Sequence, residues 1–371
     1  MTAPSAQIPD ISPDAITEAW KASESPKRLR DLAASLNASE GMLLASLAAC
    51  PNLGDRDLPL LSVQALRTDF FEDLLKGLSE FSSILAITRN EDAVHEKPGA
   101  CPLARNVHGP VWVINSLQID LRIIRNHWKR AFFVSERGRS SDAMARKSFQ
   151  IFDAAGDSVF KAYLKEESDV ESAAKLADSL KASSDEAFDR FNLNARRAAV
   201  ALVPEDELDV ETLHAGWLAL DDTHNFMRVL QKLRLGRAQA FRLAPEGLAR
   251  RLAPSAIEEM LKSAAASGLS IMSFVENPGC IQIHTGPISK VVNARGWLNI
   301  LDEGFNLHLR PEGIAEVWEV RKPTDDGIVT SVDMLAADGH RIGVFFGERK
   351  PGKPELEAWR KLAGSLPAFV E

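Results

Sequence analysis

The stretch SFQIFDAAGDSVFKAYL, residues 148–164, can be laid over SVDMLAADGHRIGVFFG, residues 331–347. Each copy has an alternating run, then a turn of small residues containing Gly156 or Gly339, and then a second alternating run. Alternation with a period of two on both sides of a glycine-containing turn predicts a β-hairpin. The chain therefore contains one hairpin twice, which indicates an internal duplication.

The duplication extends on both sides of the hairpins. Upstream, LQIDLR at 117–122 parallels FNLHLR at 305–310, and downstream KLADSL at 175–180 parallels KLAGSL at 361–366. Sequence of helical period precedes each copy, at residues 15–47 and 210–235. We therefore predict an α+β fold of two repeats, each with a large antiparallel sheet flanked by helices. The expected segments are 1–181, a connection at 182–210 that is rich in charge, and 211–371.

Composition excludes several classes of protein. The 371 residues include 44 basic and 52 acidic side chains, a net charge of −8, which argues against a nucleic-acid-binding protein. Cys50, Cys101 and Cys280 form no CxxC pair, so a disulfide framework and a structural zinc site are disfavoured. Neither GxGxxG nor GxxxxGK[ST] occurs, which removes the main support for a nucleotide-cofactor fold.

The N-terminal sequence and hydropathy point to a cytoplasmic protein. Residues 1–14 lack the basic start and apolar stretch of a signal peptide, and no apolar run reaches the ~18 residues of a membrane span. We expect no membrane insertion. The segment RDLAASLNASEGMLLA at 30–45 resembles a DNA-reading helix-turn-helix, but the negative charge favours a helical layer packed on the first repeat, with Asn37 or Ser39 as an N-cap.

One histidine interrupts an apolar helical stripe before the second repeat. Spacings of 4, 3, 4 and 3 place it on one predicted helix face with four apolar side chains: Leu213, Trp217, Leu220, His224 and Met227. On such a helix Asp221 and Asp222 fall on other faces, so no carboxylate one turn away pairs with the imidazole, although one distant in the chain could. His224 then has two interpretations, a core histidine with a backbone partner or an iron ligand for haem. Covalent haem attachment is excluded because CxxCH is absent.

The run WLALDDTHNFMRVLQKLRLGRAQAFRL, residues 217–243, resembles the haemin-degrading factors, the HemS/ChuS/HmuS-type cytoplasmic haem proteins of bacteria. That family has the pattern W-x-x-L/M-x-D-x-H-x-F. Further similar segments are GCIQIHTG at 279–286, GWLNI at 296–300, the run from 305 to 331, GER at 347–349, ITRNEDAVHEKPG at 87–99, IDLR at 119–122 and SFQIFDAAGD at 148–157. The resemblance covers most of residues 75–366.

The resemblance implies a set of haem-binding residues. His224 matches the axial iron ligand, and Arg122 matches an arginine on the distal haem face, where it would be the catalytic group if the protein is an enzyme. Lys322 and Arg349 match basic residues that meet the propionates, and Arg237 is a further candidate for that contact. His95, placed in a loop, and His308, placed in a strand, match histidines considered as alternative ligands in the family. Phe346 stands where several members have tyrosine.

Two functions remain open. The first is a carrier that takes haem in the cytoplasm and hands it to a partner such as a haem oxygenase, with the cytoplasmic side of a haem ABC transporter as a possible donor. The second is an enzyme that opens the porphyrin with oxygen and an external reductant, releasing iron. Both need one haem pocket, which the duplication and the resemblance lead us to expect between the halves. A scaffold that binds no haem ranks last.

Overall fold

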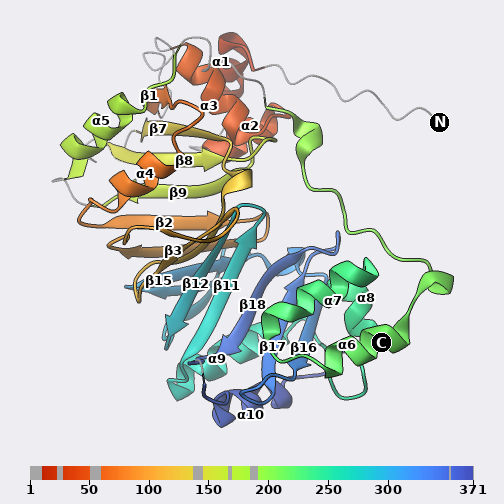
Figure 1. Ribbon diagram of the computed structural model, residues 1–371. Coiled ribbons are helices and arrows are strands. Elements are labelled where there is room, and N and C mark those ends of the chain that lie inside the picture. The colour runs from red at the N-terminus through yellow and green to blue at the C-terminus, as the bar shows by residue number, and fades with distance from the viewer. Residues whose placement is uncertain are drawn as a thin grey trace. The chain divides into compact units, whose positions relative to one another are not determined.

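The computed structural model describes residues 11–22, 28–50, 60–136, 145–165, 169–183, 191–350 and 352–370 (Figure 1). The chain forms two compact units. Unit 1 comprises residues 1–87, 98–196 and 278–280, and unit 2 comprises residues 88–97, 197–277 and 281–371. Residues 88–97 lie in the first repeat by sequence but belong to unit 2.

Unit 1 contains two antiparallel strand groups. The larger has the order β1-β7-β8-β9-β2 and the smaller has the order β6-β5-β4. The strands are β1 (Leu60–Ala65), β2 (Ile84–Arg89), β4 (Arg105–His108), β5 (Val111–Asn115), β6 (Asp120–Ile124), β7 (Arg130–Glu136), β8 (Arg146–Phe152) and β9 (Ser158–Leu164). The helices are α1 (Pro13–Lys21), α2 (Leu29–Ser35), α3 (Glu40–Ala49), α4 (Phe71–Leu78), α5 (Asp169–Ser179) and the 3-10 helices η2 (Arg125–His127) and η3 (Leu193–Ala195).

Unit 2 has the same plan. Its larger group has the order β10-β16-β17-β18-β11-β12 and its smaller group has the order β3-β15-β14-β13. The strands are β3 (Ala93–Gly99), β10 (Ala249–Leu252), β11 (Ile271–Asn277), β12 (Cys280–Gly286), β13 (Val291–Ala294), β14 (Trp297–Asp302), β15 (Phe305–Leu309), β16 (Glu316–Lys322), β17 (Val329–Leu335) and β18 (Arg341–Gly347). The helices are α6 (Val210–Leu218), α7 (Phe226–Leu233), α8 (Arg237–Arg242), α9 (Ala256–Ser267), α10 (Glu357–Ser365) and the 3-10 helices η4 (Glu205–Glu207), η5 (Thr223–Asn225) and η6 (Pro311–Gly313).

The predicted duplication and the α+β fold are confirmed. The two hairpins are β8–β9 and β17–β18, in which Ser148 pairs with Tyr163 and Ser331 pairs with Phe346 at equivalent registers. Gly156 and Gly339 both have φ +82°, a left-handed conformation that favours glycine. IDLR and FNLHLR lie on β6 and β15, and the two KLA segments lie on α5 and α10.

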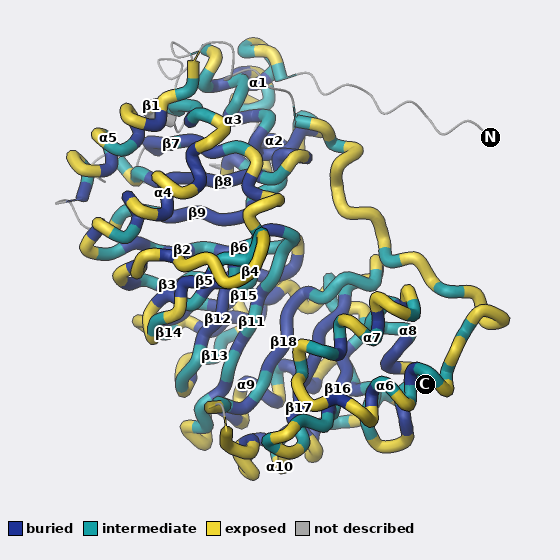
Figure 2. Tube along the Cα trace, in the orientation of Figure 1, coloured by how far each residue is buried: buried dark blue, intermediate teal, exposed yellow. Residues whose placement is uncertain are grey.

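Each larger strand group carries helices on its faces because alternate side chains of a strand point to opposite faces. In unit 1, α1–α3 pack on β7 and β8 through Phe132, Val134 and Phe152. In unit 2, α6–α8 pack on one face of β16 through Trp318 and Val320, whereas α9 and α10 pack on the other through Val317. The buried trace of Figure 2 follows these strands. Ser39 caps α3 by accepting from the Met42 N–H, which settles the alternative with Asn37.

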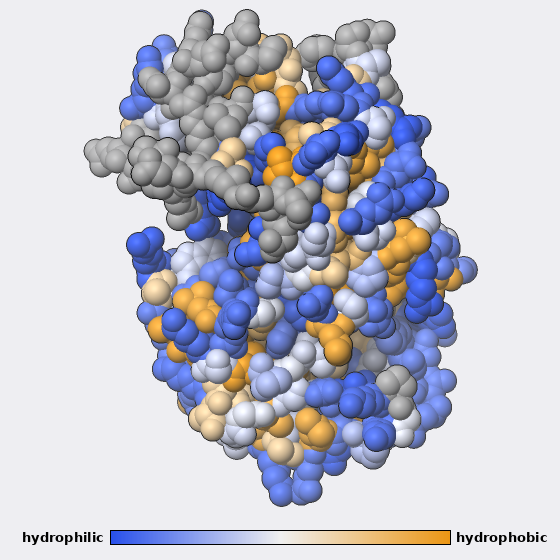
Figure 3. Space-filling model, turned by 90° about the vertical axis from the view of Figure 1, so that its left-hand side faces the viewer, coloured by the Kyte–Doolittle hydropathy of each residue, from blue (hydrophilic) through white to orange (hydrophobic). Residues whose placement is uncertain are grey.

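Among the described residues no single helix has the length and apolar character needed to cross a membrane; α2 and α3, bent by 96°, meet that test only as a pair. The face drawn in Figure 3 carries apolar side chains in several separate groups among polar ones.

Candidate functional site

The segment that carries His224 is not the single helix predicted from its spacing. α6 ends at Leu218, the short helix η5 spans Thr223–Asn225, and α7 begins at Phe226. Asp222 causes the new start, because its side chain accepts from the His224 N–H at 2.8 Å as an N-cap does. The prediction that all five stripe residues share one helix face is therefore wrong. Leu213 and Trp217 are fully buried, whereas the side chain of His224 is 91% exposed.

His224 has a carboxylate partner, Asp222, which the helical interpretation had placed on another face. Nδ1 of His224 lies 2.6 Å from Oδ1 of Asp222. The N–H of His224 lowers the pKa of Asp222 most, so this carboxylate is ionised at neutral pH and accepts from Nδ1–H. In the neutral imidazole, Nε2 is then the nitrogen with the free lone pair, on the side of the ring away from Asp222. A carboxylate–imidazole pair of this kind orients a histidine that binds a metal.

Aromatic side chains fix the helices around His224 to the sheet. The indole N–H of Trp217 donates to the carbonyl of Arg321 at 3.0 Å, at the end of β16. Trp217 and Phe226 meet edge to face at 4.4 Å between ring centroids, and Phe241 stacks on Phe226 at 6.2 Å. Phe226 follows His224 by two residues, so the turn bearing the imidazole is attached to β16 through this cluster.

Two cations of the predicted site lie beside this cluster with no carboxylate partner among the described residues. Lys322, the last residue of β16, is 8% exposed and its Nζ lies 5.0 Å from the centre of the Phe226 ring. Burial lowers the pKa of Lys322 to about 8, and it lowers the pKa of Arg237 to about 10. Within the described part of the chain, Arg237 makes a polar contact with the sulfur of Met227, at 3.0 Å from Nη2. Unpaired buried cations destabilise a protein unless a ligand brings the opposite charge.

The two acids of the same face are already paired. Arg341, on β18, contacts both Glu276 of β11 and Asp333 of β17. Asp333 also accepts from the Ser331 hydroxyl at 2.6 Å. Burial opposes the ionisation of Glu276, but Arg341 and Arg237 outweigh it, and the pKa of the carboxyl is lowered. Arg341 therefore forms the direct ion pairs with both acids, and together with Lys322 and Arg237 it gives this face three cations against two carboxylates.

The remaining predicted residues of unit 2 follow the same strands. Arg349 lies two residues beyond β18, and its Nε is buried with no hydrogen-bond partner among the residues that the structure describes. Phe346 of β18 is half-buried and packs on Phe274 of β11 at 5.3 Å between ring centroids. These rings form a partly exposed apolar surface on the strands that carry Glu276 and Arg341.

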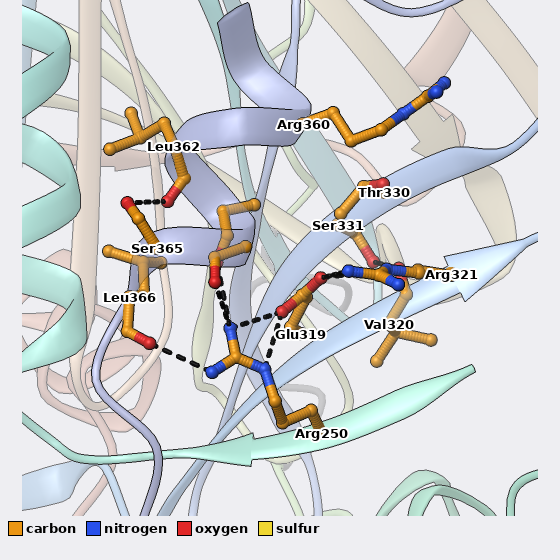
Figure 4. Close-up of polar contacts among 12 residues, drawn as sticks. Arg250, Glu319, Val320, Arg321, Thr330, Ser331, Arg360, Leu362, Ser365 and Leu366 are labelled. Carbon is orange, nitrogen blue, oxygen red and sulfur yellow. Dashed lines mark hydrogen bonds and ion pairs between the residues drawn. The ribbon is translucent and has the colours of Figure 1, made fainter. Parts of the chain in front are cut away.

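The other face of β16 holds a second charged network, which is structural. Glu319 is 2% exposed and accepts from Arg250 and Arg321, at 2.9 and 2.7 Å (Figure 4). Arg250 also donates to the carbonyls of Ala363 and Leu366 at the end of α10. Arg250 thereby joins β10, β16 and the end of α10 on the face of β16 opposite Lys322.

Arg122 belongs to unit 1, whereas the other predicted haem-binding residues belong to unit 2. It sits on β6 and forms an ion pair with Asp120, two residues before it. Its side chain is 32% exposed.

Comparison with known proteins identifies the family. The family model described as the haemin-degrading HemS.ChuX domain matches residues 57–180 and 234–366. The chain belongs to this family.

Relatives and solved structures match nearly the whole chain. Hemin transport protein HemS of Yersinia enterocolitica is 35% identical over 342 residues, 92% of this chain and 93% of the relative. The crystal structure of holo-PhuS, a heme-binding protein from Pseudomonas aeruginosa, has 40% identity and a TM-score of 0.85, covering 96% of this chain and all of the other. ChuS, described as an Escherichia coli heme oxygenase, has 33% identity and a TM-score of 0.79, covering 95% and 99%.

The two alternative histidines of this HemS/ChuX-family chain are both engaged in sheet structure. His95 lies on β3 and is fully buried, which corrects its predicted place in a loop. Neither of its ring nitrogens has a hydrogen-bond partner among the described residues. His308 lies on β15, as predicted, and its Nδ1 is 2.6 Å from Oδ1 of Asn299.

Sequence reasoning missed Asp222 and the acid pair held by Arg341. The signal for Asp222 was present, because an aspartate two residues before a histidine is typical of the capped start of a new helix. For Arg341 the sequence offers only a weak signal: the equivalent residue of the first repeat is the uncharged Ser158, so the charge is specific to the second repeat.

Proposed function

We propose that this protein binds haem and carries it within the cytoplasm to a partner that degrades or uses it. The observation that supports the proposal most is one arrangement in unit 2. An exposed imidazole, oriented by Asp222, is attached to a strand whose buried terminal Lys322 forms no ion pair with any residue that the structure describes. The relatives named as hemin transport and heme-binding proteins support the same ligand.

His224 is the proposed iron ligand. Its Nε2 is free to coordinate, and Asp222 makes the imidazole a stronger donor by accepting from Nδ1–H. The described residues contain no group of three or more His, Cys, Asp or Glu side chains suited to holding a metal ion. One histidine suffices for haem because the porphyrin itself supplies four nitrogens to the iron.

Lys322, Arg237 and Arg349 are the proposed partners of the haem propionates. Charge-assisted hydrogen bonds to carboxylates are among the stronger polar contacts, and these side chains are not engaged by acids of the described chain. Phe274 and Phe346 would contact the apolar porphyrin. Phe346 cannot donate the hydrogen bond that a tyrosine at its position could.

Arg122 is the proposed distal residue, where its guanidinium would donate to a water, hydroxide or oxygen bound to iron. A haem oxygenase as acceptor and the cytoplasmic side of a haem ABC transporter as donor are the proposed partners of this carrier.

A haemin titration followed at the Soret band tests the proposal. Wild type is expected to give a saturable band, and His224→Ala is expected to bind more weakly with a shifted band, because one iron ligand is lost. His214→Ala is the matched control, since His214 lies on α6 and its Nε2 is occupied by the Leu243 carbonyl at 2.8 Å. Identical spectra for wild type and His224→Ala would remove His224 as the ligand. No saturable band in wild type would reject haem binding altogether.

The second candidate function is haem degradation, favoured by the similarity to ChuS, described as a heme oxygenase. Arg122 would then act on iron-bound oxygen. Incubation of the haemin complex with ascorbate in air, with catalase present to remove free peroxide, distinguishes the two functions. Loss of the Soret band with release of iron in wild type, slowed in Arg122→Ala, would indicate an enzyme. A stable band would leave the carrier role.

A further inference from the structure

Lys322 is a buried amine whose charge is not balanced in the free protein. The charged groups that act on it are Asp333 from β17, Arg341 from β18 and Arg237 from α8. From α7 it meets the face of the Phe226 ring. Asp333 is already bound by Arg341 and by the Ser331 hydroxyl, so the nearest acid is shared. Two of the three charged neighbours are cations.

We infer that haem loading at this face is coupled to the uptake of one proton at Lys322, so that lower pH favours loading and higher pH favours release. This inference rests on the proposed function, because a haem propionate supplies the anion. Before binding, burial and the two arginines disfavour the charged form of the amine, and Asp333, which is already bound by Arg341, opposes them only in part. A carboxylate placed against it reverses that preference and holds the proton on Nζ.

The direction of the effect follows from linkage. The ordinary pKa of lysine is near 10.5, whereas burial first, and then Arg341 and Arg237, lower that of Lys322 to about 8 against the opposing effect of Asp333. Near pH 8 about half of the free molecules therefore carry a neutral Lys322. A bound carboxylate raises the pKa again, so the complex binds more protons than the free protein. Affinity then falls as pH rises above 8, by up to about tenfold per pH unit.

The coupling is tested with two ligands and a matched pair of variants. Dissociation constants are measured between pH 7 and 9, below the pKa of about 10 of Arg237, for haemin and for iron-free protoporphyrin IX, which keeps both propionates but has no iron-bound water to titrate. Lys322→Arg keeps the positive charge and cannot lose its proton in this range. Lys290→Arg makes the same change at an exposed lysine of the same unit.

Wild type and Lys290→Arg are expected to lose affinity for both ligands above pH 8, whereas Lys322→Arg keeps a flat profile for protoporphyrin IX. Wild type is also expected to take up roughly half a proton per ligand near pH 8, seen with an indicator dye in weak buffer. Equal slopes in wild type and Lys322→Arg would overturn the coupling.

A second variant covers the case in which Lys322→Arg does not fold. Lys322→Met then serves instead, and it is expected to bind weakly with no dependence of affinity on pH in the same range. A slope in Lys322→Met equal to that of wild type would overturn the coupling. Absence of haemin binding at every pH would instead reject the proposed function.

Discussion

At the scale of single residues, the site depends on which charges are paired and which are not. Asp222 is paired with His224, Glu276 and Asp333 are paired with Arg341, and Lys322 forms no ion pair within the described ranges. These pairings leave two kinds of group for a ligand in the proposed site. One is Nε2 of His224, and the other is the set of cations Lys322, Arg237 and Arg349. Haem, with one iron and two carboxylates, has the complementary groups.

Replacing Asp222 tests the orientation of the imidazole. Asp222→Asn keeps the size of the side chain but weakens its acceptance from Nδ1–H, so we expect haemin affinity to fall about 10- to 100-fold. Asp221→Asn is the control, because Asp221 bonds Asn225 and not His224. Titration at the Soret band measures both variants. Equal affinities of Asp222→Asn and wild type would show that the pair does not support iron binding.

At the scale of elements, strands β3 and β12 bring two neutral histidines into the core of unit 2. His95 on β3 is fully buried and His284 on β12 is 7% exposed, and no ring nitrogen of either has a hydrogen-bond partner among the described residues. Both rings pack on Phe305, and His284 stacks at 3.9 Å between centroids. Burial is the largest cause that lowers both pKa values, that of His284 to about 4.

These histidines predict a loss of stability in mild acid. In the unfolded chain the imidazole of His284 has its ordinary pKa near 6.5. In the folded chain its pKa is about 4, so the imidazole stays neutral until the pH approaches that value. Stability is therefore complete above pH 6.5 and falls as the pH drops toward 4, by about 2 kcal/mol between pH 7.5 and 5 for His284 alone. Urea unfolding measures the free energy.

His284→Phe is expected to reduce this pH dependence, while the exposed His108→Gln leaves it unchanged. If His284→Phe loses as much stability as wild type between pH 7.5 and 5, the protonation of His284 is not the cause.

At the scale of the whole molecule, the two repeats differ in how they balance buried charge. Register places Glu136 of β7 at the position of Lys322 of β16. Glu136 pairs with Arg146 at 3.0 Å, and the buried Lys161 of the same sheet pairs with Glu40 of α3 at 2.6 Å. Unit 1 thus satisfies these charges within itself, whereas Lys322 of unit 2 has no ion-pair partner among the residues described.

This asymmetry predicts one strong haem site per chain. Haemin titration of wild type is expected to saturate near one equivalent, and Lys322→Met is expected to weaken that site. Calorimetry gives the stoichiometry directly. Two sites of equal affinity would show that unit 1 binds haem despite its internal ion pairs.

The ion pair of unit 1 gives a stability prediction. Glu40→Ala leaves Lys161 buried without its partner, so we expect the free energy of unfolding to fall by about 3 kcal/mol. Glu171→Ala breaks the exposed pair with Lys175 and is expected to change it little. Urea unfolding compares the two. An equally small effect of both variants would show that the Glu40–Lys161 pair does not stabilise the fold.

The sequence by itself determined the duplication, the two hairpins and the helical segments before each repeat, because strand alternation, turn glycines and helical period are local properties. It also singled out His224. Tertiary structure decided the break after α6, the exposure of His224, the place of residues 88–97 in unit 2 and the pairing of Arg341 with two acids. These features depend on contacts between residues distant in sequence or on a cap competing with a helical period. Periodicity along the chain does not record which charges meet in space, and the ion pairs of Arg341 with Glu276 and Asp333 depend on that meeting.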